Sequence, residues 1–100
     1  MPIACQPKAL SHEQRERQHT LLLEVRGKVQ ETRELPDGVD LRLPTDMVLF
    51  RDVAEWIALE RTCCPFLSFS LRWEADDQVW VAVSGGADAK AVIAAEILGR

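Results

Sequence analysis

The sequence predicts an α+β fold: a two-layer sandwich with a four-stranded, mostly antiparallel sheet and the element order α-β-β-α-β-β-α. Apolar and polar residues alternate in two pairs of segments, and a turn signal joins each pair, Pro36-Asp37-Gly38 in one and Asp76-Asp77 in the other. A helix-forming segment follows each pair, and two helices can cover the single apolar face of such a sheet.

The N-terminal residues are expected to form an arm and a short helix. Residues 1–10 hold two prolines and no periodic pattern, which indicates an extended, flexible arm. Ser11 and Gln14 have the form of a capping box for a polar helix that reaches His19. Since the whole chain has 100 residues, we expect one domain, over residues 11–100.

Alternation with a period of two places the four strands. Leu21, Leu23, Val25 and Val29 alternate with polar residues, which predicts a first strand over residues 21–30. The turn joins it to a strand over residues 39–43. The second hairpin is expected to pair residues 67–73 with residues 79–83.

Capping residues and prolines set the ends of the other two helices. Thr45 or Asp46 can cap a helix from Met47 to Thr62, which must stop before Pro65 because the residue preceding a proline avoids helical geometry. An alanine-rich helix is predicted over residues 87–98, ahead of a glycine.

The sheet face away from the helices is expected to be open and polar, with Trp80 as its single large apolar residue. An exposed tryptophan among charges would mark a ligand contact or a homodimer interface. Alternatively, the arm or the first helix covers it. By alternation, this face is expected to carry Glu24, Arg26, Lys28, Asp40, Arg42, Ser68, Ser70, Arg72 and Trp80.

Composition excludes several classes of function. A formal net charge of -4 disfavours binding to a nucleic acid backbone, and no apolar run approaches the roughly 20 residues of a membrane span. Ser84-Gly85-Gly86 lacks the lysine and spacing of a phosphate-binding loop, so no nucleotide cofactor is expected. The N-terminus lacks the regions of a signal peptide. We therefore expect a cytoplasmic protein whose three cysteines are thiols.

Potentially reactive residues gather in Glu60-Arg61-Thr62-Cys63-Cys64-Pro65-Phe66. On a helical wheel Glu60, Cys63 and Cys64 lie on the apolar stripe that also holds Trp56. A carboxylate on such a stripe is costly unless it is paired, hydrogen-bonded or protonated.

Three interpretations of this cluster stay open. In a structural one, Glu60 pairs with Arg61 or Arg72, and the cysteines are core residues. In a binding one, Cys63 and Cys64 hold a thiophilic metal or metalloid ion with Glu60 as a third ligand or proton acceptor. A further ligand would come from Cys5 on the arm, from His12 or His19, or from the cysteine pair of a second copy in a dimer.

In the third interpretation, one of the two adjacent cysteines is a redox or nucleophilic centre with a pKa well below about 8.5. The C-terminus of a helix disfavours a thiolate, so we expect a binding protein rather than an enzyme. The alternative from another class is an interaction protein, a homodimer through the Trp80 face.

The same segment carries a family resemblance. Glu60, Arg61, Cys63-Cys64-Pro65-Phe66 and Phe69 match a motif, E-R-x-C-C-P-F-x-x-F, and the chain resembles a group of small bacterial proteins that share it, over residues 11–98. The resemblance implies a stand-alone cytoplasmic protein and carries no activity with it.

Overall fold

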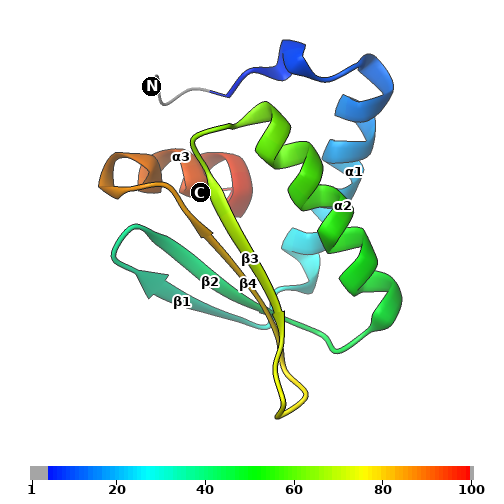
Figure 1. Ribbon diagram of the computed structural model, residues 1–100, viewed down its shortest axis with the longest axis vertical. Coiled ribbons are helices and arrows are strands. Elements are labelled where there is room, and N and C mark those ends of the chain that lie inside the picture. Colours follow the sequence, from blue (N-terminus) through cyan, green and yellow to red (C-terminus); the bar gives the residue numbers. More distant parts are fainter. Residues whose placement is uncertain (1–4, 100) are drawn as a thin grey trace.

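The computed structural model describes residues 5–99 and confirms the predicted α+β class and element order (Figure 1). A short 3-10 turn, η1 (Pro7–Ala9), precedes α1 (His12–Lys28), and α2 is Met47–Cys63. The strands are β1 (Glu31–Leu35), β2 (Gly38–Leu43), β3 (Ser68–Trp73) and β4 (Val79–Ser84). The C-terminal helical segment holds α3 (Lys90–Ile93) between a 3-10 turn, Ala87–Ala89, and a π-helical turn, Ala94–Leu98.

The four strands form one antiparallel sheet in the order β1-β2-β4-β3. Leu41 of β2 pairs with Val81 of β4 at its centre, and both side chains are fully buried. They belong to one core cluster with Val53 of α2, Leu21 of α1 and Ile93 of α3. The helices therefore cover one face of the sheet, and α1 packs beside α2 (Figure 1).

The predicted strand over residues 21–30 is wrong, because these residues extend α1 to Lys28. Leu21 and Val25 are buried, while Leu23 between them is 50% exposed. A spacing of four residues puts two side chains on the same helical face, so the alternating pattern also fits a helix. The N-terminal capping box of Ser11 and Gln14 is confirmed.

Two features of the open face of the sheet differ from the prediction: the residues that form its edge strand and the exposure of Trp80. Glu24, Arg26 and Lys28 lie on α1 and not on the sheet. Trp80 is only 4% exposed: the Arg33 guanidinium of β1 lies 4.1 Å from the centre of its ring. Among the described residues, this contact comes from the edge strand β1 rather than from the expected arm or first helix.

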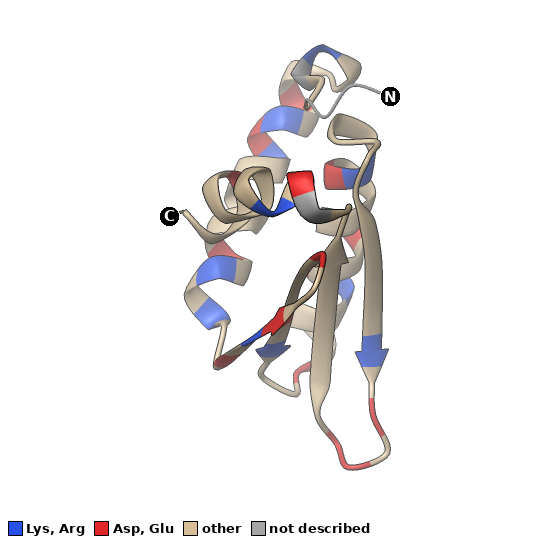
Figure 2. Cartoon of the chain, turned by 90° about the vertical axis from the view of Figure 1, so that its left-hand side faces the viewer, with Lys and Arg blue, Asp and Glu red and all other residues tan. Residues whose placement is uncertain are grey.

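Ion pairs occupy the same face. Arg72 bonds Asp40 at 2.8 Å and Glu74 at 2.9 Å, so it is not the partner of Glu60. Trp80 is thus not the exposed anchor that a homodimer through this face was expected to use. Both basic and acidic residues occur along α1 (Figure 2). Within residues 5–99, no helix combines the length and apolar character needed to cross a bilayer.

Residues 5–10 of the expected arm lie against the domain, and residues 1–4 are outside the described part of the chain. Leu10 is 5% exposed and joins the core. The backbone N–H of Gln6 donates to the carbonyl of Cys63, the last residue of α2. The arm is therefore tied to the end of α2 by its backbone.

The helical assignment of residues 21–28 can be tested with two leucines two residues apart. Leu21→Ala is expected to lower the free energy of unfolding by about 3 kcal/mol, because it leaves a cavity in the core. Leu23→Ala is expected to change it by less than about 0.5 kcal/mol. Urea denaturation followed by circular dichroism measures both. Equal losses would indicate the strand, in which both residues share a face.

Candidate functional site

The end of α2 places two cysteines at the junction of helix, arm and sheet. The helix finishes at Cys63, and Cys64 is its C-cap, whose N–H donates to the Glu60 carbonyl at 2.6 Å. Pro65 cannot donate the next helical hydrogen bond, so the chain turns here. Cys63 is 6% and Cys64 is 1% exposed.

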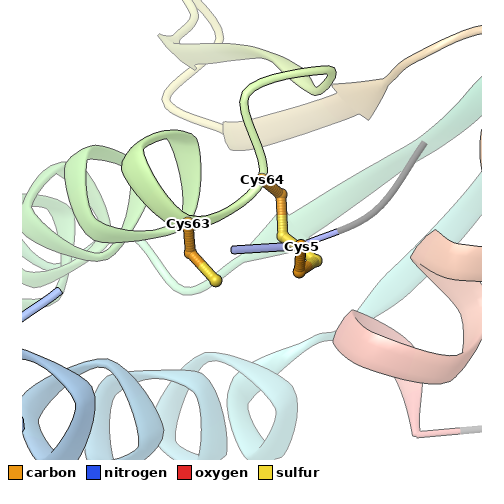
Figure 3. A group of neighbouring side chains, drawn as sticks. All are labelled: Cys5, Cys63 and Cys64. Carbon is orange, nitrogen blue, oxygen red and sulfur yellow. A yellow bond between two sulfur atoms is a disulfide. The ribbon is translucent and has the colours of Figure 1, made fainter. Parts of the chain in front are cut away.

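The third cysteine reaches this junction from the arm. Cys5 and Cys64 form a disulfide across a sequence separation of 59, and Cys63 is a free, buried thiol (Figure 3). The expectation of three thiols is therefore wrong for this structure, since the arm lies close enough to α2 for a bond between sulfurs. The adjacent pair, Cys63 and Cys64, is not bonded to itself.

All three sulfur atoms lie within 4.8 Å of one another. They line a cavity of about 470 Å³. Around them the wall is made by side chains of α1, α2 and the C-terminal helical segment: Gln18, His19, Leu22, Glu60 and Glu96. Sequence reasoning had identified Cys5, Cys63, Cys64 and Glu60, and the structure brings these four together.

Glu60 lies at the inner wall of the cavity and is 3% exposed. The indole Nε1–H of Trp56 donates to its Oε1 at 3.1 Å, and Trp56 in turn packs edge-on against Phe69 at 5.6 Å between ring centres. Burial raises the pKa of the Glu60 carboxyl, although hydrogen bonds from Gln18 and Trp56 oppose this shift.

The arginines expected beside Glu60 lie elsewhere. Arg61 is exposed on α2, and Arg72 is held by the open face of the sheet. The sequence did not identify Gln18 as a residue of the site, because the predicted helix ended near this position and a strand was expected to begin at Leu21. The one available signal for Gln18 was its spacing of three to Leu21, which puts both residues on one side of a continuous helix.

The free thiol of Cys63 has its pKa raised, chiefly by burial and also by the nearby Glu60 charge, while Gln18 opposes the shift. Thiol-redox chemistry at this residue requires the opposite direction, because the thiolate is the nucleophile. The direction of this shift therefore counts against an activated, nucleophilic thiol at Cys63.

No protein-family model matches the sequence, and searches of curated proteins and of solved structures found no significant similarity. The geometry of the cysteine cluster is therefore the feature from which a function can be inferred.

Replacing the buried carboxyl with an amide is expected to stabilise the protein at neutral pH. In the unfolded chain Glu60 loses its proton near its ordinary pKa of 4.5, whereas the folded protein keeps it to higher pH. Wild-type stability therefore falls as pH rises through this window. Glu60→Gln removes the fall and should gain of order 1 kcal/mol at pH 8 and nothing at pH 4.

Urea denaturation between pH 4 and pH 8 measures this difference. Glu55→Gln is the matched control, because Glu55 is exposed on the same helix and paired with Arg17 at 2.9 Å. It should show no gain at pH 8. A Glu60→Gln variant that is less stable than wild type at pH 8 would mean that the folded protein prefers the charged carboxylate.

The burial of Cys63 predicts slow alkylation. With Cys5 and Cys64 bonded, Cys63 is the one thiol of the chain that can react. At pH 8, iodoacetamide is expected to modify it at least about tenfold more slowly than an unfolded control in urea, because the thiol is both inaccessible and largely protonated. Intact mass against time measures the rate. Equal rates in the two conditions would show an accessible, activated thiol.

Proposed function

We propose that the reduced protein binds one thiophilic metal or metalloid ion through Cys5, Cys63 and Cys64. The observation that carries the proposal is the convergence of three sulfur atoms, from segments 59 residues apart, to within 4.8 Å of one another. Thiolates select soft ions over hard ones. Cys5 takes the position that sequence reasoning had offered to Glu60 as third ligand.

The number of ligands favours an ion that binds reversibly over a structural ion that the fold requires. A structural zinc site is closed by four protein ligands, but the metal-ligating side chains gathered here, among residues 5–99, are three cysteines. His19 and Glu60 line the same cavity without belonging to that group. One side of the ion would stay open to the cavity, which allows entry and release.

The disulfide makes ion binding dependent on the redox state. While Cys5 and Cys64 are bonded, their sulfurs are not thiolates and Cys63 is left alone. Two molecules of a monothiol reductant convert the disulfide to two thiols and leave as their own disulfide. The ion-binding form therefore belongs to a reducing compartment such as the cytoplasm, and the bonded form is its ion-free oxidised state.

Native mass spectrometry of the phosphine-reduced protein tests the proposal. Titration with Zn²⁺, Cu⁺, Hg²⁺ and arsenite should yield one retained ion per chain for at least one of them. The oxidised protein and Cys63→Ser should retain it at least about tenfold more weakly, because each removes sulfur ligands.

Circular dichroism must show that the variant is folded, and Thr62→Ser provides a matched control at an exposed position of the same helix end. The control should bind as wild type does. The same spectra report the oligomeric state. If the reduced protein retains none of the four ions against a competing monothiol, the cysteines are core residues and the proposal fails.

A further inference from the structure

Resting on the proposed function, we propose that the ion is a trivalent metalloid, arsenic or antimony in its +3 state, held by Cys5, Cys63 and Cys64 as a neutral trithiolate. The proposal stands on two features of the cavity: the number of sulfurs that converge and the charges that surround them.

The number of sulfurs fixes the charge of the complex for each kind of ion. Three thiolates carry three negative charges in total. A monovalent ion such as Cu⁺ then leaves two of them uncompensated, and a divalent ion such as Zn²⁺ or Cd²⁺ leaves one. A trivalent centre leaves none. An uncompensated charge is costly to bury unless an opposite charge accompanies it.

The cavity offers no such compensation. Its wall includes two acidic side chains, Glu60 and Glu96, and no lysine or arginine among the described residues that line it. His19 is the one lining residue that can become a cation, and it is exposed on α1. The indole of Trp56 donates its N–H to Glu60, and Gln18 supplies a hydrogen bond to Cys63 but no charge. A negatively charged trithiolate would therefore face like charges, whereas a neutral one would not.

The coordination geometry agrees with the charge. A trivalent arsenic or antimony centre holds three sulfurs on one side in a trigonal pyramid and keeps a lone pair on the other, so it needs no fourth ligand. Cys5, Cys63 and Cys64 supply three sulfurs within 4.8 Å of one another. The lone pair can face the open cavity, which Leu22 lines beside the cysteines.

The reaction balances without any redox partner once the disulfide has been reduced by a thiol or a phosphine. Arsenous acid is a neutral molecule at pH 8 and enters an acidic cavity without repulsion. Three arsenic–oxygen bonds break and three arsenic–sulfur bonds form. The three thiol protons leave with the three hydroxyl groups as water, and arsenic stays in its +3 state throughout.

Native mass spectrometry at pH 8 tests how many arsenic–sulfur bonds form. The phosphine-reduced protein is titrated with arsenite and antimonite. The expected arsenite adduct has the mass of one arsenic atom less three hydrogens. An adduct that keeps one hydroxyl and loses only two hydrogens would contain two sulfur bonds and would overturn the trithiolate. Each single variant, Cys5→Ser, Cys63→Ser and Cys64→Ser, is expected to weaken arsenite binding at least about tenfold.

A second experiment tests the charge argument through the ratio of the Cd²⁺ affinity to the arsenite affinity. Glu96→Gln removes one acidic group from the cavity wall at an exposed position. It is expected to raise this ratio about fivefold, because only the cadmium complex carries charge. Glu55→Gln is the control, since Glu55 is an exposed glutamate outside the cavity wall. An unchanged ratio in Glu96→Gln would overturn the selectivity.

The two proposals can fail separately. If the reduced protein retains Cd²⁺ or Hg²⁺ through the cysteines but does not retain arsenite or antimonite, the thiophilic site stands and the trivalent assignment fails. If it retains no ion of either class, the site itself fails, and the trivalent assignment fails with it.

Discussion

The stop of α2 at Cys63 is the constraint on which the rest of the site depends. Pro65 ends the helix, and the chain must turn to begin β3 five residues after Cys63. The turn leaves the Cys63 carbonyl free of the helical ladder, and the backbone N–H of Gln6 bonds it. That contact brings Cys5 to Cys64. In a helix that continued for another turn, the Cys63 carbonyl would accept a hydrogen bond within the helix and would not be left over for Gln6.

The packing of α1 against α2 forms the other wall of the site and sets its polarity. Because α1 continues to Lys28, Leu21 and Val25 lie on one face of the helix and pack in the core. Gln18, one turn before Leu21, lines the cavity at the C-terminal end of α2. Gln18 and Trp56 together hydrogen-bond a carboxyl that burial otherwise disfavours. A buried acid beside three cysteines lowers stability at neutral pH, so its neighbours must offset this cost. An apolar residue at this position would pack without that cost.

Much of the architecture could be predicted from the sequence, and the errors have physical causes. The second hairpin alternates clearly, and the limits of α2 follow from Asp46 and Pro65, so both were predicted to within a residue or two. The strand over residues 21–30 failed because Leu21 and Val25 satisfy a period of two and a spacing of four at once. β1 escaped notice because its sequence, Glu-Thr-Arg-Glu-Leu, has no apolar face: it is an edge strand that places Arg33 over Trp80. The approach of Cys5 to Cys64 depends on tertiary contacts between segments 59 residues apart, which local patterns do not encode.

The disulfide and the proposed ion are alternative cross-links between the same parts of the chain. Closing a loop across a separation of 59 residues removes entropy from the unfolded state worth about 4 kcal/mol in the chain-entropy description. Reduction gives up that stabilisation, and the arm is then held by the hydrogen bond from Gln6 to Cys63 and by the packing of Leu10. An ion that binds all three sulfurs restores the same connection and stabilises the folded state further as its concentration rises above its dissociation constant. Ion capture in the reduced protein would therefore be coupled to the position of the arm, because the arm supplies one of the three sulfurs.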